Sequence, residues 1–372
     1  MGGMRAYIGS FTSAGGRGIT TASIDEDTGA LTALSATDVL ADPSYLALSD
    51  DGEVLYAVSE SERGQVAAFG VRAERPEPLG APVAVGGASP THLALAAGHL
   101  VTANYGSGSV SWLPVRAGGQ LGAAGAGAGV LRHTGSGPDP ERQRGPHAHQ
   151  VLPDPSGRWV LSVDLGTDSV RVCSLVASEA VAGKAVEGGA VTGEAITGEA
   201  GALAELRTHR EVVLRPGSGP RHLAFHPRGD LAYVVHELSA TVTCCRWDAQ
   251  AGHLEPLGET RLLHGGPVAG DAYPSGLVVS TDGRFLWAAT RGQDVISVLA
   301  LDGDGVRPRL VTTVASGGHW PRDLALHPSG RFLYAAHERS GDVTWFAVDP
   351  ESGALRRAGA IEAPAASCVV FG

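Results

Sequence analysis

Lysine is almost absent from this chain of 372 residues, which contains only Lys184. That residue lies in a low-complexity segment, so the sequence argues against Schiff-base chemistry, which needs an amine in a defined site. Positive charge is also in short supply: the net charge of −11 argues against a nucleic-acid or membrane-surface partner. No run approaches the roughly 18 apolar residues that a membrane span needs. The first residues, MGGMRAYIGS, do not resemble a signal peptide. We therefore expect a cytoplasmic protein.

Metal-binding and disulfide signals are equally scarce. The four cysteines, Cys173, Cys244, Cys245 and Cys368, have neither CxxC spacing nor any other spacing typical of metal ligands, so we expect buried free thiols. There is no HExxH, and the stretch GPHAHQV alone is a weak metal signal. We expect no metal and no cofactor.

Glycine and proline, by contrast, are abundant, with 53 and 22 residues, and favour an all-β chain with many turns. The stretch PRHLAFHPRGDLAYVVHE, residues 220–237, predicts two β-strands over 222–225 and 231–235 joined by the turn 226–229. An antiparallel hairpin brings the start of its first strand beside the end of its second. Arg221 and Glu237 are therefore expected side by side at the open end of this hairpin.

The same hairpin pattern recurs along the chain. Copies occupy residues 43–60, 90–105, 148–165, 220–237, 274–291 and 321–338, and a seventh is split between residues 364–372 and 4–11. A third and a fourth strand follow each hairpin, as in residues 341–362. Seven four-stranded units predict an all-β, seven-bladed β-propeller. Pairing of the two chain ends would close the ring and remove free sheet edges, so we expect one domain over residues 1–372.

Two segments interrupt this period. Residues 177–205 contain four near-copies of a five-residue motif rich in Gly, Ala and Thr, and predict a mobile surface loop in preference to a short β-solenoid. This insert lies between the third and fourth strands of the third unit, on the face opposite Arg221 and Glu237. Residues 122–146 enter the first strand of that unit on the same face as Arg221, where they could wall or cover a pocket.

The repeats differ most in two columns of residues that share one face near the ring centre. The column before the first strand is Ser44, Thr91, His149, Arg221, Ser275, Arg322 and Ala365. The column after the second strand is Glu60, Tyr105, Leu165, Glu237, Arg291, Glu338 and Phe11. Core columns carry Leu, Val, Phe or Ala in nearly every copy, whereas these two carry most of the side chains capable of chemistry.

Consecutive units in these columns supply His149, Arg221, Glu237 and Arg291. A neutral histidine or an ionised glutamate can take a proton from water, and paired arginines can hold a carboxylate or phosphate and stabilise an oxyanion. Arg–Glu pairs at such junctions can also be purely structural, and spacing alone does not separate the two interpretations. We further expect His147 and Arg322 to contact the substrate.

The stretches YIGSFTS, RQRGPHAHQV, DLGTDSV, GSGPRHLAFHPRGDLAYVVHEL, DGRFLWAATRGQDVISV and GHWPRDLALHPSGRFLYAAHE span nearly the whole chain in order. In them the chain resembles the lactonase family of seven-bladed propellers, which includes cycloisomerase-like 6-phosphogluconolactonases and fungal carboxymuconate lactonizing enzymes. The resemblance places the family's proposed active-site histidine on His149, its arginines on Arg221 and Arg291, and its glutamate on Glu237. The family often has Asn before the glutamate and before the second arginine, where this chain has His236 and Thr290.

These observations together predict a metal-independent lactonase that acts on a small anionic sugar lactone, with 6-phosphogluconolactone as the expected substrate. His149 is the expected base, with Glu237 as the alternative, and the protein is expected to be a monomer or weak oligomer. One rival is lactonization or isomerization of a muconate-type diacid. A second is a non-catalytic propeller that binds a protein or peptide through an exposed aromatic patch, to which Tyr105, Trp112 and Trp320 could contribute.

Overall fold

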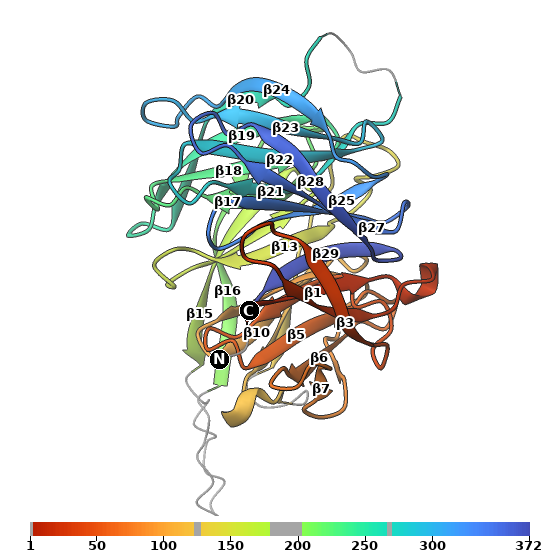
Figure 1. The fold of residues 1–372 in the computed structure, drawn as a ribbon. Coiled ribbons are helices and arrows are strands. Elements are labelled where there is room, and N and C mark those ends of the chain that lie inside the picture. Colours follow the sequence, from red (N-terminus) through yellow and green to blue (C-terminus); the bar gives the residue numbers. More distant parts are fainter. Residues whose placement is uncertain (1–2, 123–127, 179–202, 266–269) are drawn as a thin grey trace, which may run out of the picture.

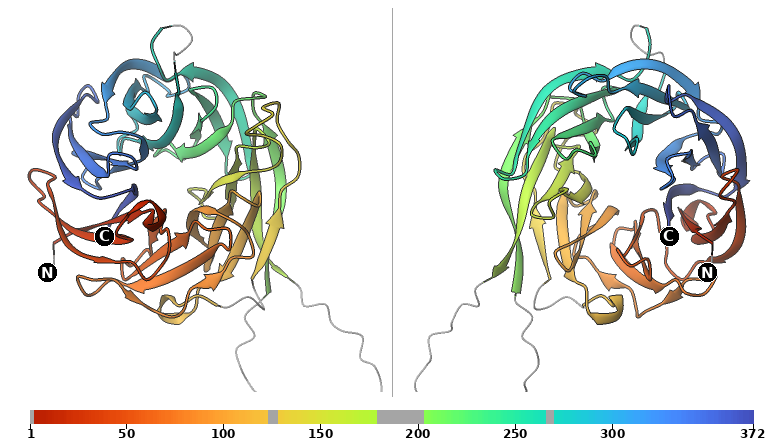
Figure 2. Two further views of the ribbon diagram at one scale, coloured as in Figure 1. Left: turned by 90° about the vertical axis from the view of Figure 1, so that its right-hand side faces the viewer. Right: turned by 60° about the vertical axis from the view of Figure 1, so that its left-hand side comes forward.

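The computed structural model describes residues 3–122, 128–178, 203–265 and 270–372. In these residues the strands form seven antiparallel sheets set around a central axis, and the two chain ends lie close together (Figure 1 and Figure 2). The seven-bladed propeller predicted from the repeats is confirmed. Among the described residues no helix is of a length and apolarity that would cross a membrane.

The blades are numbered here from the first complete hairpin. Blade 1 contains β4 (Leu46–Leu48), β5 (Val54–Ser59), β6 (Gln65–Gly70), β7 (Glu77–Pro78) and β8 (Val83–Ala84). Blade 2 contains β9 (Pro90–Ala96), β10 (His99–Asn104), β11 (Ser109–Pro114) and β12 (Gly129–Arg132). Blade 3 contains β13 (Ala148–Pro153), β14 (Val160–Asp164), β15 (Ser169–Ser178) and β16 (Leu203–Val213). Blade 4 contains β17 (Pro220–Phe225), β18 (Leu231–His236), β19 (Thr241–Asp248) and β20 (His253–Arg261).

Blade 5 contains β21 (Tyr273–Val279), β22 (Phe285–Arg291), β23 (Val295–Ala300) and β24 (Arg309–Ala315). Blade 6 contains β25 (Pro321–Leu326), β26 (Phe332–His337), β27 (Asp342–Val348) and β28 (Leu355–Glu362). Blade 7 joins the chain ends through β29 (Ala366–Phe371), β1 (Arg5–Ser10), β2 (Ile19–Ile24) and β3 (Leu31–Thr37). Two short 3-10 helices, η1 (Thr12–Ala14) and η2 (Ala117–Gly119), complete the described elements.

The first strand of each blade lies innermost, because the first strands of neighbouring blades contact one another. The hydrophobic core lies between the blades. In one such layer Leu161 and Val163 of blade 3 pack with Leu223, Val234 and Trp247 of blade 4. Each second strand therefore buries both faces, which explains why the sequence gives it a continuous apolar run instead of a strict alternation.

Many neighbouring blades are also joined by a hydrogen bond from the O–H or N–H group of an aromatic side chain. These bonds lie on the side of the propeller that carries the hairpin turns. The side chain in the second strand donates to a backbone carbonyl in the next blade, as Tyr233 does to Gly305 at 3.0 Å. The same contact is made by Tyr56 to Gly119, Trp159 to Ala249, Trp287 to Gly353 and Tyr334 to Gly29. These bonds satisfy the polar atoms of large buried rings and fix the register of adjacent blades.

The insert expected over residues 177–205 does lie between the third and fourth strands of blade 3. The two strands extend into it, since Ser178 pairs with Leu203, Ala177 with Ala204 and Val176 with Glu205. The insert is therefore shorter at both ends than the sequence composition indicated. The choice between a mobile loop and a β-solenoid concerns residues 179–202, which lie outside the described residues.

Candidate active site

A β-bulge near the start of the first strand turns one residue of several blades out of the hydrogen-bonding ladder. In blade 4 Pro220 pairs with His236 and His222 pairs with Val235, so that Arg221 has no partner. The pairing skips Thr91, His149 and Arg322 in the same way, and in blade 5 the skipped residues include Ser275. A bulge re-aims a side chain, and here the bulges separate these residues from the apolar layers between the blades.

The split blade 7 corrects one position of this column. Ser10 pairs with Ala366 and Gly9 with Cys368, so the skipped residue is Ser367, not Ala365 as the sequence alignment indicated. Ala365 instead accepts the N–H of Phe11 at 3.1 Å, as Gly219 accepts that of Glu237 at 2.7 Å. The alignment was wrong by two residues because the C-terminal strand lacks a turn glycine to fix its register.

Glu237 is the centre of a buried ion cluster. Its carboxylate oxygens lie 2.6 Å from Arg291 Nη2, 3.2 Å from Arg221 Nε and 2.5 Å from Arg142 Nη2. The side chains of Glu237, Arg221 and Arg291 are almost completely buried, and Arg142 is about one-third exposed. Three guanidiniums around one carboxylate leave an excess of two positive charges, which favours an anionic ligand.

The cluster fixes the charge states of its members. Burial by itself would raise the pKa of Glu237, but the guanidiniums of Arg291 and Arg221 outweigh it and hold the pKa well below its usual range. Burial and the neighbouring Arg291 lower the pKa of Arg221 to about 9, which still leaves this arginine charged at pH 7. An ionised carboxylate held by three arginines is a weak base, so the geometry favours a structural and orienting role for Glu237.

His149 lies beside this cluster, among aromatic rings. Its imidazole makes edge contacts with the rings of His222 at 5.2 Å and Tyr105 at 5.6 Å between centroids. Burial and the positive charge of Arg221 hold the pKa of His149 well below 6.5, so the ring is neutral at pH 7. A neutral imidazole can accept a proton. His149, Arg221, Glu237 and Arg291, which were predicted from the two columns, are thus brought together.

His147 lies at the edge of the same group. Its Nδ1 is 2.9 Å from the carbonyl oxygen of Tyr105, and its ring stacks on the Tyr105 ring at 4.4 Å. A carbonyl only accepts, so the Nδ1–H of His147 is the donor in this hydrogen bond. The backbone N–H of His147 donates to Asp164 Oδ1 at 2.9 Å, which ties this residue to the end of β14.

Arg142 is the site residue that the columns did not reveal. It lies in the segment that enters blade 3, which was expected only to wall or cover a pocket. The turn around it is held by the buried Gln143, whose side chain donates to the carbonyl of Leu165 at 2.8 Å and accepts from the N–H of Asp139 at 3.1 Å. Residues 139–143 thus reach from blade 3 to Glu237 of blade 4.

Arg322 lies on the other side of the ring centre. Its guanidinium pairs with Glu338 at 2.9 Å and stands 4.9 Å above the ring of Phe11. Glu60 accepts a hydrogen bond from the Ser44 hydroxyl at 2.5 Å, and burial raises its pKa. This half of the centre holds one guanidinium and two carboxyl groups, the reverse of the balance around Glu237.

Between the two halves is a small central cavity of about 20 Å³. It is lined by Ser44, Tyr45, Glu60, Thr91, His149, Arg221, His222, Arg322, Asp323 and Ser367. Tyr45, His222 and Asp323 follow the column residues directly and form a second layer; burial raises the pKa of Asp323 to about 7. The volume matches roughly one water molecule. A ligand larger than a water molecule must therefore bind at the mouth, above this layer.

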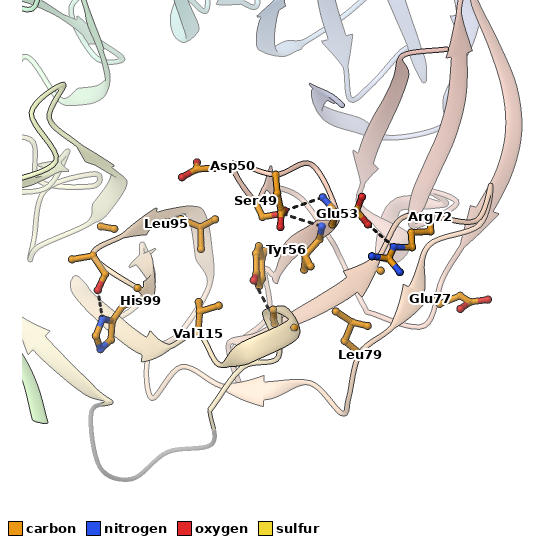
Figure 3. A pocket seen from close by; sticks show the side chains of 18 of the residues that line it. Ser49, Asp50, Glu53, Tyr56, Arg72, Glu77, Leu79, Leu95, His99 and Val115 are labelled. Carbon is orange, nitrogen blue, oxygen red and sulfur yellow. Dashed lines mark hydrogen bonds and ion pairs between the residues drawn. The ribbon is translucent and has the colours of Figure 1, made fainter. Parts of the chain in front are cut away.

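A much larger cavity lies elsewhere, between blades 1 and 2 on the hairpin-turn side (Figure 3), with a volume of about 800 Å³. Val54, Tyr56 and Leu95 line it together with charged residues at its edge. Arg72 there is already paired with Glu53 at 2.5 Å. Among the described residues, the lining of this cavity has a single arginine and no cluster of guanidiniums around a carboxylate, so size alone does not make it the reactive site.

The residues considered for a protein-binding patch do not form one. Trp112 is buried in the core, Tyr105 stacks on His147, and Trp320 is covered by the guanidinium of Arg339. The large apolar side chains that are exposed in the described residues lie on separate elements: Leu34, Val39, Val213 and Val311. The polar mouth fits a small charged ligand better than an apolar partner.

The four cysteines and the possible metal ligands form no reactive site among the described residues. Cys173, Cys244, Cys245 and Cys368 are buried free thiols, as their spacing predicted. In the described part of the chain no three His, Cys, Asp or Glu side chains come together as a metal-binding group. Metal independence stays a prediction.

Comparison with known proteins agrees with this architecture. Residues 5–371 match the family model described as lactonase, 7-bladed beta-propeller. The chain is 31% identical over 372 residues to a 6-phosphogluconolactonase of Bacillus subtilis, covering 98% of this chain and 97% of that protein.

Two solved structures are similar over almost their whole length. One is a putative 6-phosphogluconolactonase from Bacteroides fragilis, with a TM-score of 0.85, 28% identity, and coverage of 99% of this chain and 98% of that one. The other is the periplasmic gluconolactonase of Pseudomonas aeruginosa, with a TM-score of 0.84, 27% identity and the same coverage. The chain belongs to the seven-bladed β-propeller lactonase family.

Proposed function

We propose that this protein hydrolyses a sugar lactone, 6-phosphogluconolactone, to the open-chain acid. The observation that carries the proposal is the buried cluster of Arg142, Arg221 and Arg291 around Glu237, with the neutral His149 beside it. The cluster has an excess of positive charge, and a lactone becomes an oxyanion during hydrolysis and a carboxylate afterwards. Both species are anions, which the guanidiniums of the cluster can stabilise by charge-assisted hydrogen bonds.

In this reaction His149 takes a proton from a water molecule while the water oxygen adds to the lactone carbonyl carbon. The carbonyl oxygen becomes an oxyanion, which Arg221 and Arg291 stabilise. The bond from that carbon to the ring oxygen then breaks, and the ring oxygen leaves with the proton that His149 had taken. Glu237 holds the two guanidiniums in place and offsets part of their charge.

The named relatives support lactone chemistry but differ in substrate. The Bacillus subtilis protein is called a 6-phosphogluconolactonase and the Pseudomonas aeruginosa protein a gluconolactonase, which differ by a phosphate. The names of the relatives therefore do not decide whether the substrate of this protein carries a phosphate. The residues of this chain have to decide it. A cytoplasmic location and a monomeric or weakly oligomeric state stay predictions.

The test is hydrolysis of a lactone panel by the purified protein, with acid release followed at constant pH and the uncatalysed rate subtracted. We expect turnover of 6-phosphogluconolactone, unchanged after treatment with EDTA. Carboxymuconate is the control for the rival diacid chemistry. Turnover of the diacid without turnover of any lactone would replace the proposal with that rival.

A further inference from the structure

The rim above the Glu237 cluster carries a second arginine on an aromatic platform. The guanidinium carbon of Arg339 stands 3.4 Å from the ring centroid of Trp320, and that of Arg291 stands 5.7 Å from it. Tyr273 meets the edge of the same indole at 6.2 Å between centroids. Trp320 thus connects the buried arginine of the candidate site to an exposed one.

The backbone holds Trp320 in a conformation that a bulky residue rarely adopts. Its φ angle is +69°, in the left-handed region, as are the φ angles of the equivalent residues in four other blades, Asp42, Ser89, Gly219 and Ala365. Its N–H donates to Asp294 Oδ1 at 2.8 Å, and its carbonyl accepts from the N–H of Glu338 at 3.1 Å. Positive φ at this position is therefore a property of the repeat, and blade 6 differs in placing a large indole there.

Arg339 differs from the other arginines of this mouth in its charge partner. Arg291 and Arg322 are paired with Glu237 and Glu338, whereas Arg339 makes no ion pair with any described residue. Its side chain is exposed, and the indole beneath fixes the plane of the guanidinium. A planar guanidinium held over a ring with its edge in solvent suits bidentate binding of a phosphate.

The spacing of the two arginines fits one ligand. Distances of 5.7 Å and 3.4 Å to the same centroid place the two guanidinium carbons at most about 9 Å apart. In a six-membered lactone phosphorylated on its exocyclic carbon, about five bonds of roughly 1.5 Å separate the carbonyl carbon from phosphorus. With a hydrogen bond of about 3 Å at each end, one molecule can reach both groups.

We propose that Arg339, held on Trp320, binds the phosphate of the substrate while Arg221 and Arg291 receive the lactone carbonyl. The inference rests on the proposed lactonase function and deepens it, because it assigns the preference for a phosphorylated substrate to one residue outside the buried cluster. The sugar ring would then lie along the indole between the two arginines.

The test compares kcat/KM for 6-phosphogluconolactone and for the unphosphorylated gluconolactone in the wild type and in Arg339→Gln. A charge-assisted contact to phosphate that is present before and during the reaction acts mainly on KM. We expect the ratio of the two kcat/KM values to fall about 10–100-fold through a higher KM for the phosphorylated lactone.

The matched control is Arg331→Gln. Arg331 is also exposed and stands 5.4 Å over an aromatic ring, that of Phe332, but it lies in the turn between β25 and β26 on the other side of the propeller. Its replacement should leave the ratio unchanged.

An unchanged ratio in Arg339→Gln would overturn the assignment, and so would a wild type that does not prefer the phosphorylated lactone. In both cases the lactonase function itself would stand. A wild type that opens neither lactone would overturn the proposed function and this inference together.

Discussion

The two halves of the ring centre use the same column positions for opposite charge balances. Around Glu237 three arginines surround one carboxylate, and the pKa of that carboxylate lies well below its usual range. Across the centre one arginine, Arg322, faces Glu338 and Glu60, and burial raises the pKa of Glu60. Repeated strands therefore provide the positions, and the local excess of charge decides which half can hold an anion. The predictions below change the half around Glu237, and those for Glu237 and Arg291 use the other half as their control.

The largest effect on activity is expected for His149→Ala. Loss of a general base typically lowers the rate about 10²–10⁴-fold, and we expect kcat/KM for the lactone to fall by that factor. The measurement is lactone hydrolysis together with a thermal unfolding scan. Full activity in a folded His149→Ala protein would mean that another group takes the proton.

Glu237→Gln should destabilise the protein most. Removal of this buried anion leaves Arg142, Arg221 and Arg291 without compensation, which costs about 3–5 kcal/mol of the free energy of unfolding. Glu338→Gln, in the other half, removes a half-exposed partner of one arginine and should cost about 1 kcal/mol or less. Denaturant unfolding of both variants measures the difference. Equal losses would show that the Glu237 cluster is no more than an ordinary ion pair.

Arg291→Gln should lower kcat/KM about 10²–10³-fold, since an oxyanion donor contributes on that order. Arg322→Gln should lower it less than about tenfold, because Arg322 is already paired with Glu338. Steady-state kinetics on the same lactone compare the two. A larger loss in Arg322→Gln would move the reaction to the other half of the ring centre.

The pH profile gives the smallest expected effect. Burial and the charge of Arg221 hold the pKa of His149 well below 6.5, so the base form persists at neutral pH and kcat/KM should fall in acid as His149 becomes protonated. Arg221→Gln removes the repulsion, raises the pKa of His149 and should move the acid limb of the profile to higher pH. A shift to lower pH would contradict this account of the electrostatics.

The repeats explain why so much was predictable. Because each blade has the same hairpin, one alignment predicted the seven blades, the closure of the ring and the positions of His149, Arg221, Glu237 and Arg291. The bulges that turn Arg221 and His149 out of the strand ladder were not visible, since a bulge adds a residue without changing the composition of a strand.

Other features lay beyond the alignment for physical reasons. Arg142 comes from an irregular segment that has no copy in other blades, so no internal comparison could single it out. Ser367 was missed because the split strand has no turn glycine to set its register. The role argued for Trp320 depends on its contacts with Arg339 and Arg291, which come from different blade elements and which sequence composition does not report.

A crystal structure with 6-phosphogluconate bound tests the central claim most directly. We expect the carboxylate of this product within hydrogen-bond distance of Arg221 and Arg291, beside His149. Product bound instead beside Arg322, or in the large cavity between blades 1 and 2 with the Glu237 cluster left empty, would contradict the account.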